Sequence, residues 1–152
     1  MTAVRRKMHP DGFSIAVTNV AKGRRIFSAP RAKNIVSTVM QGEGIRAAKV
    51  SVVFVDDARI RRINSQFLHH RSVTDVITFP LEEAPDLEAE IYVNLQQAKR
   101  QAEIFGVSVR NEAVRLIVHG TLHALGYDDR RTKQRKTMFE KQERYVTALC
   151  KS

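Results

Sequence analysis

The segment that most constrains the fold is 108–125, which predicts a helix with apolar side chains around most of its circumference. A helix of this kind is normally buried at the centre of a domain, whereas a surface helix keeps one face polar. We therefore expect the other elements to pack around it. Its apolar residues are Ala113, Val114, Leu116, Ile117, Val118, Leu122, Ala124 and Leu125.

Four polar residues interrupt this apolar surface and fall three or four positions apart: Glu112, Arg115, His119 and His123. Residues with this spacing lie on the same face of a helix. Because burial of a polar group without a partner is costly, the stripe must face a cleft, a metal ion or a buried polar network.

The rest of the chain predicts short strands alternating with helices. Runs at 13–19, 49–55, 73–81 and 89–95 are typical of strands, and 49–55 of a central strand covered on both faces. Helical spacing predicts helices that begin near Pro30, after Asp56 or Asp57, at Asn94 and near Thr132. The order βαβαββααα predicts an α/β or α+β domain in which about five helices flank a small mixed four-stranded sheet.

Three of these helices carry more specific expectations. Asn94 followed by Gln97 resembles a capping box for a helix that runs to about Phe105. The apolar faces that helical spacing predicts are Ile60, Ile63 and Phe67 in the second helix, and Met138, Phe139, Tyr145, Val146 and Leu149 in the last.

Length and composition favour a single soluble domain over residues 1–152. It opens with a basic arm, residues 1–12, whose order the sequence leaves open. The one cysteine, Cys150, cannot form an internal disulfide, and no apolar run follows the basic start of the chain. Both observations argue against secretion and a membrane span, so we expect a cytoplasmic protein.

The formal net charge of +10 is concentrated toward the two ends. Residues 1–50 hold ten Lys and Arg against two acids, and residues 101–152 hold ten against six, whereas the middle holds six against eight. Basic ends on one face would suit a phosphate backbone, although a solvated basic surface without a partner is the alternative.

The stretch His119–Asp129 (HGTLHALGYDD) is where the sequence suggests chemistry. Histidines four apart on a helix project from one face, about 6 Å apart along the axis, and form a known zinc half-site. Gly126 can turn the chain so that Asp128 or Asp129 completes a three-ligand site with a position left for water. Two core histidines with satisfied hydrogen bonds are the alternative. Gly120 stands where an HExxH peptidase has its glutamate, which disfavours peptide hydrolysis.

The chain resembles the YbeY endoribonucleases, also described as ribosomal RNA maturation factors. The family signature H-G-x-L-H-x-x-G-Y-D-H is similar to 119–129, and the family's L-N and T-D-V-L-S-F-P are similar to Ile63-Asn64 and 74–80 (TDVITFP). Glu90-Ile91, with Ala89 in a glycine position, resembles a third block. The resemblance covers about residue 50 to the C-terminus.

This resemblance implies a cytoplasmic, single-strand-specific, metal-dependent endoribonuclease. It would act in maturation of the 3′ end of small-subunit (16S) rRNA and in late ribosome quality control, with single-stranded rRNA and the small ribosomal subunit as partners. A zincin-like helix would hold one Zn²⁺, or another divalent transition metal ion, through His119, His123 and Asp129. Two roles are open for Asp128: it would be the third ligand in place of Asp129, or it would orient one of the ligand histidines. The candidate RNA contacts come instead from the basic ends of the chain: Arg5, Arg6, Lys7, Arg24, Arg25, Arg130 and Arg131.

Two departures from the family pattern bear on activity. Asp129 stands where the family has a histidine, and a carboxylate should acidify bound water less than a third neutral imidazole does. Leu68 stands where the family has an arginine thought to contact the RNA phosphate. Arg71 or His70 can replace that arginine and offset charge that develops in the transition state, although an ordinary polar loop is the alternative interpretation of this segment.

No residue stands out in the sequence as a general base. Two alternative functions therefore stay open. One is a ribosome-associated RNA-binding or assembly factor whose metal is structural. The other is a metal-dependent hydrolase with a small substrate. The oligomeric state is not predicted.

Overall fold

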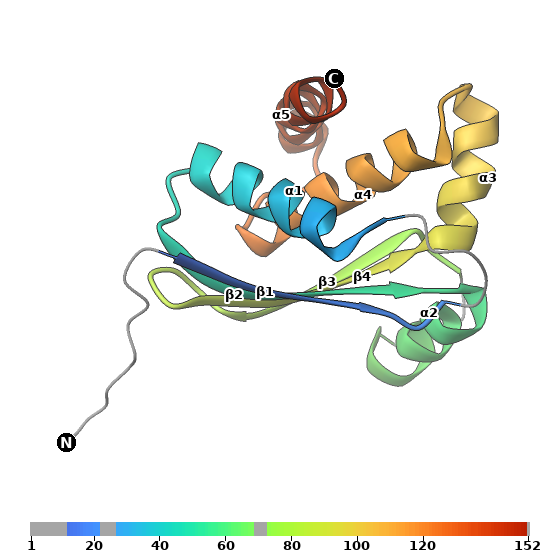
Figure 1. Cartoon of the computed structure of the whole chain (residues 1–152), viewed down its shortest axis with the longest axis horizontal. Helices are drawn as coiled ribbons and strands as arrows, with labels where there is room; N and C mark the ends of the chain where they lie inside the picture. Colours follow the sequence, from blue (N-terminus) through green and yellow to red (C-terminus); the bar gives the residue numbers. More distant parts are fainter. Residues whose placement is uncertain (1–11, 22–26, 69–72, 152) are drawn as a thin grey trace.

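The computed structural model describes residues 12–21, 27–68 and 73–151, in which helices cover a four-stranded sheet mainly on one face (Figure 1). The predicted order of strands and helices is confirmed. The strands are β1 (Gly12–Asn19), β2 (Ala47–Val55), β3 (Val76–Glu82) and β4 (Leu87–Asn94). The helices are α1 (Ala29–Gly42), α2 (Asp57–Ile63), α3 (Leu95–Phe105), α4 (Val109–Ala124) and α5 (Thr132–Leu149), with a π-helical turn, η1 (Asn64–Leu68), after α2.

The sheet is mixed, as predicted, with strand order β1-β2-β4-β3. Strands β1, β2 and β4 are parallel, and β3 pairs antiparallel with β4. Every second residue of β2 and β4 is buried on the face toward α1 and α4, and all of these except Ala89 belong to the main core. The opposite face is covered only in part, by α2, so the expectation that β2 is buried on both faces holds for only part of its length: Lys49 is exposed.

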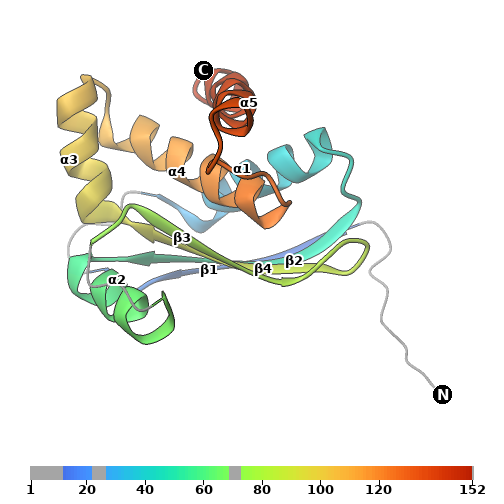
Figure 2. The same ribbon diagram turned by 180° about the vertical axis from the view of Figure 1, so that it is seen from behind.

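Helix α4 occupies the central position that its apolar circumference predicts. It contacts α1, α3 and α5 as well as strands β3 and β4. Helix α5 lies on the side of α4 that faces away from the sheet, which both views show (Figures 1 and 2). The polar stripe of α4 therefore faces α5 and the loop that joins the two helices.

Helix α5 packs most of the predicted residues against the core, and Tyr145 and Leu149 are partly buried there. Met138 and Val146 are buried as expected, but the Phe139 side chain is 57% exposed, so its assignment to the core was wrong. Gln142 is buried instead, with 6% exposed. The physical reason is helical phase: 138, 142 and 146 are four apart and form one stripe, whereas 139 lies at its edge.

Two local expectations near the ends of α2 and β4 were also wrong in part. Phe67, expected to continue the apolar face of α2, is 63% exposed, because the backbone widens into η1 after Ile63 and shifts the residues that follow. The Asn94 side chain caps α3 by accepting from the backbone N–H of Gln96 and Gln97. The reciprocal half of the capping box is missing, since the Asn94 backbone N–H donates to the carbonyl of Asp75.

None of the helices in the described parts of the chain combines the length and apolarity needed to cross a membrane.

Candidate metal centre

Three side chains meet where α4 ends and the loop to α5 begins. The Nε2 atoms of His119 and His123 lie 3.6 and 3.3 Å from Oδ2 of Asp129. The ligand atoms of all three residues lie within 4.8 Å of one another. The two imidazoles come from successive turns of one helix face, and their ring centroids are 4.6 Å apart.

Asp129 reaches the histidines because the chain reverses at Gly126. Gly126 has φ of +99°, the left-handed conformation that glycine adopts without strain, as the sequence predicted. The Gly126 and Tyr127 backbone N–H groups donate to the carbonyl oxygens of His123 and Leu122, which fixes the turn against the end of α4.

A carbonyl oxygen lies behind each imidazole. The Nδ1 atom of His119 is 2.6 Å from Oε1 of Gln142, and the Nδ1 atom of His123 is 3.0 Å from the backbone oxygen of Tyr127. A carbonyl can only accept a hydrogen bond, so in the neutral imidazoles Nδ1 carries the proton and Nε2 carries the lone pair. Both lone pairs then point toward Asp129.

This donor set fits a transition metal ion. Two neutral imidazoles and a carboxylate direct three acceptor atoms at one another, with no donor hydrogen among them. A cation bound between the three atoms would remove this electrostatic repulsion. Tetrahedral bonds of about 2.0 Å place ligand atoms about 3.3 Å apart, close to the observed 3.3 and 3.6 Å. All three side chains are partly exposed, which leaves solvent access to a further coordination position.

Asp128 faces away from this group. Its carboxylate makes a bidentate ion pair with the guanidinium of Arg130, with a shortest distance of 2.7 Å. Hydrogen bonds from Arg130 hold the pKa of Asp128 at about 2. The geometry therefore brings Asp129, and not Asp128, to the two histidines.

Of the other predicted site residues, Arg130 and Arg131 lie beside the metal group, at the start of α5, and both are exposed. The proposed catalytic residues His70 and Arg71 lie outside the described residues. So do the proposed RNA contacts Arg5, Arg6, Lys7, Arg24 and Arg25.

The sequence interpretation missed Gln142, which contacts His119. The available signal was a polar residue within the apolar stripe of a helix, the same signal that singled out the histidines of α4. Because Phe139 was assigned to that stripe, Gln142 was overlooked.

Glu43, the second missed residue, ties the metal loop to α1. Its carboxylate accepts hydrogen bonds from the hydroxyls of Tyr127 and Tyr145, both at 2.6 Å, and from Nζ of Lys141 at 3.3 Å. Burial raises the pKa of Glu43, but these three donors outweigh it, and the pKa lies below its ordinary value. No local pattern marks Glu43, because its partners lie at least 84 positions away in the chain.

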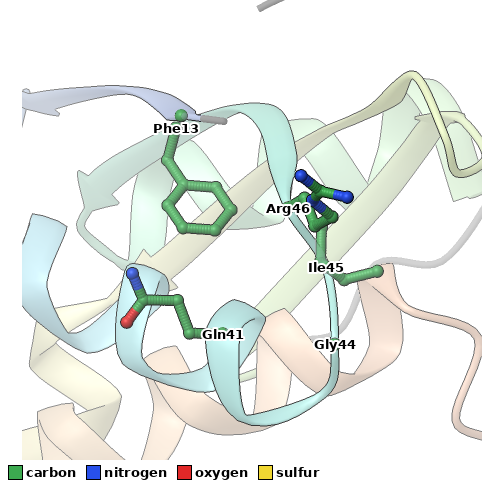
Figure 3. Close-up of a pocket in the computed structure, with 6 residues that line it drawn as sticks. Phe13, Gln41, Gly44, Ile45 and Arg46 are labelled. Atoms are coloured by element: carbon green, nitrogen blue, oxygen red, sulfur yellow. The ribbon is translucent and has the colours of Figure 1, made fainter. Parts of the chain in front are cut away.

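A cavity of about 330 Å³ lies elsewhere, between the start of β1 and the end of α1 (Figure 3). None of His119, His123 and Asp129 lines it, so this cavity and the candidate metal site are separate features of the structure. The lining residues are Gly12, Phe13, Gln41, Gly44, Ile45 and Arg46.

Fold and site together define a class of protein: an α/β domain in which two histidines of the central helix and one nearby carboxylate form a group that could hold a metal ion. The family model for endoribonuclease YbeY matches residues 18–150. The chain therefore belongs to the YbeY endoribonuclease family.

Relatives and a solved structure agree with this assignment. The chain is 36% identical to the endoribonuclease YbeY of Chlorobium phaeovibrioides, over 83% of this chain and 85% of that protein. It is 39% identical to the endoribonuclease YbeY of Pelotomaculum thermopropionicum, over 73% and 79%. The solution structure of TM1509 from Thermotoga maritima is similar, with a TM-score of 0.64 and 32% identity over 89% of this chain and 88% of that one.

Proposed function

We propose that this chain is a metal-dependent endoribonuclease that cleaves single-stranded RNA, with His119, His123 and Asp129 as the ligands of one Zn²⁺ or another divalent transition metal ion. The observation that carries the proposal is the convergence of two imidazole lone pairs and one carboxylate oxygen, supported by carbonyl groups behind both rings. Membership of the YbeY family supplies the reaction class.

Each residue of the site has a distinct role in this proposal. When bound, the ion supplies Lewis-acid chemistry, in which it polarises a phosphodiester oxygen and activates water. Gln142 and the Tyr127 carbonyl hold the ligand imidazoles in their binding orientation. Arg130 and Arg131 attract the RNA backbone toward the site, and Arg71 or His70 offsets the negative charge that develops during cleavage.

The biological substrate that we propose is the 3′ end of small-subunit (16S) rRNA, with the small ribosomal subunit as partner and a further role in ribosome quality control in the cytoplasm. We propose that residues 1–152 act as one domain. The basic residues Arg5, Arg6, Lys7, Arg24 and Arg25 would extend the RNA contacts of Arg130 and Arg131.

The test combines metal analysis with RNA cleavage. Wild type is expected to bind about one equivalent of Zn²⁺ and to cleave single-stranded rRNA fragments, whereas the double variant His119→Ala/His123→Ala should lose both properties. Glu103→Ala, an exposed acid of α3 outside the site, should match wild type. Equal cleavage by wild type and the double variant would remove the proposed metal-dependent activity.

A second candidate function is RNA binding in ribosome assembly, with the metal as a structural link between α4 and α5. The presence of Asp129 and Leu68 at positions where the resemblance implies histidine and arginine favours this candidate. It predicts that fully metal-loaded wild type binds the RNA fragments and leaves them intact.

A further inference from the structure

We propose that Glu143 and Arg115 are positioning residues that fix the direction of the Gln142 amide and so select the His119 tautomer that can bind a metal ion. This inference rests on the metal site proposed above. It assigns a role to an ion pair that does not itself touch the ligand residues.

The Gln142 amide is held at both ends. Its Oε1 atom lies 2.6 Å from Nδ1 of His119, and its Nε2 atom lies 3.0 Å from Oε2 of Glu143. The two ends of an amide have the same shape but opposite hydrogen-bonding character. If the amide turned over, its NH₂ group would face Nδ1 of His119. That nitrogen would then have to accept, and the ring proton would move to Nε2, where the metal ion binds.

Glu143 prevents this reversal because an ionised carboxylate can only accept hydrogen bonds. Arg115 keeps it ionised through a bidentate pair, with Nε and Nη2 of Arg115 at 2.8 and 3.0 Å from the carboxylate oxygens. The hydrogen bonds from Arg115 lower the pKa of Glu143 despite the opposing effect of burial, and the bond from Gln142 adds to the lowering. The NH₂ end of Gln142 must therefore face Glu143, and the carbonyl end must face His119.

Arg115 is itself held in place on α4, one turn before His119. Its Nη1 atom donates to Oε1 of Glu112 at 3.0 Å and to Oδ1 of Asn111 at 2.9 Å. Glu112 is only 2% exposed and also accepts from Gln101 at 2.7 Å. Glu112, Arg115 and His119 of the polar stripe thus belong to one directed hydrogen-bond network, in which fixed donors and acceptors determine the orientation of Gln142.

His123 provides an internal contrast. Its Nδ1 atom faces the backbone oxygen of Tyr127, which has no donor end and cannot reverse. Of the two ligand histidines, His119 alone depends on a side chain that could turn over. A perturbation of the Glu143–Arg115 pair should therefore change the tautomer of His119 and leave that of His123 unchanged.

The direct measurement is nitrogen-15 NMR of the imidazoles in the metal-free protein, at a pH where both rings are neutral. In wild type we expect both histidines in the Nδ1–H form. In Glu143→Gln the amide at 143 can donate as well as accept, so we expect His119 to populate the Nε2–H form while His123 does not change. Zn²⁺ affinity, measured by competition with a chelator, should weaken by roughly 10-fold, the lower end of the range for partners of ligand histidines.

The matched control exchanges the two groups. The double variant Gln142→Glu/Glu143→Gln has the same composition and charge as wild type, but it places the obligate acceptor directly behind His119. We expect it to restore the Nδ1–H form and most of the Zn²⁺ affinity. The double variant has no carboxylate at position 143 and so lacks the ion pair with Arg115. If that pair served only to join α4 to α5, the double variant would restore neither the tautomer nor the Zn²⁺ affinity.

The outcomes separate this inference from the proposed function. An Nε2–H His119 in metal-free wild type, or an unchanged tautomer and affinity in Glu143→Gln, would overturn the inference even if the protein cleaves RNA. A correct tautomer pattern in a protein that binds no Zn²⁺ would leave the inference standing and remove the proposed metal site. Thermal unfolding of each variant tests whether a loss of Zn²⁺ affinity reflects a loss of fold. The tautomer measurement on wild type needs no variant and is independent of that control.

Discussion

The hydroxyl of Thr78 on β3 donates a hydrogen bond of 3.0 Å to the backbone oxygen of Gly120, which lies between His119 and His123 on α4. This contact shows how closely α4 approaches the sheet. A Cβ atom at position 120 would lie 2.6 Å from Cγ2 of Ile91 and 3.1 Å from Oγ1 of Thr78. The glycine in the histidine motif is therefore a packing residue, and a glutamate there has no space and would face the sheet instead of the metal group.

We expect Gly120→Ala to destabilise the fold. The added methyl group must push α4 away from β4, and overpacking of this kind costs about 1–3 kcal/mol. The gain of up to about 1 kcal/mol in helix propensity offsets only part of this cost. Denaturant unfolding measures the difference.

The matched control for that experiment is Gly12→Ala in β1, where an added Cβ meets nothing within 4 Å. It should leave the free energy of unfolding nearly unchanged. A Gly120→Ala protein as stable as wild type would contradict the close packing of α4 on the sheet.

The neighbours Asp128 and Asp129 allow a direct test of the ligand assignment. Asp129→Asn removes the carboxylate that faces the two histidines, so Zn²⁺ affinity should fall by at least the roughly 10–100-fold that loss of an outer partner of a ligand costs. Asp128→Asn removes a carboxylate bound to Arg130 and should leave Zn²⁺ affinity within a few-fold of wild type. Calorimetric titration of both variants checks the pair, and the reverse order of effects would assign Asp128 as the ligand.

The parts of the site that the sequence predicted are those whose residues lie close together in the chain. The two histidines, the turn at Gly126 and the two acids that follow lie within eleven residues. Helix geometry and one glycine therefore predicted that Asp128 or Asp129 would meet the histidines, and the family resemblance favoured Asp129. Gln142 reaches His119 from another helix, and its identification required the phase of α5 to within one residue. Because Phe139 is apolar, the sequence favoured it over Gln142 as a buried residue of α5. Phe139 is nevertheless exposed, which shows that helical phase, and not the apolarity of one residue, decides what is buried.

The fold was predictable to a similar degree. The order of elements and the mixed sheet follow from hydrophobic periodicity, which is a local property. The π-helical turn that exposes Phe67 departs from the period of the α-helix, so α-helical spacing misplaces that residue. The contacts of Glu43 join segments far apart in the chain, which periodicity does not report.

Glu43 should make stability depend on pH in the acidic range. Its pKa is lower in the folded protein than the ordinary value of 4.5, so its ionised form stabilises the fold above that value, and this contribution is lost as the pH falls through the folded pKa. We expect Glu43→Gln to lose about 1–3 kcal/mol near neutral pH, the scale of hydrogen bonds to a charged group.

Unfolding of wild type and Glu43→Gln across acidic pH provides the check. The difference between the two proteins should shrink as the pH falls through the lowered pKa of Glu43, because the wild-type carboxyl becomes protonated and neutral like the amide. Tyr145→Phe, which removes one donor to Glu43, should show a smaller difference with the same trend. A difference that stays constant with pH would mean that the charge of Glu43 does not contribute.

Arg130 and Arg131 should differ in their contribution to RNA binding although they are neighbours. The guanidinium of Arg130 is neutralised by Asp128, whereas no ion pair involves Arg131 within the parts of the chain that the structure describes.

Each phosphate contact on a single strand contributes about 0.7 to the slope of log affinity against log salt concentration. Arg131→Ala should therefore lower the slope by about that amount, and Arg130→Ala by less, because the guanidinium of Arg130 is already paired with Asp128. Titration of a labelled single-stranded RNA at several salt concentrations measures both slopes, with Glu103→Ala as the control. Equal slopes for Arg131→Ala and wild type would show that RNA does not pass over the start of α5.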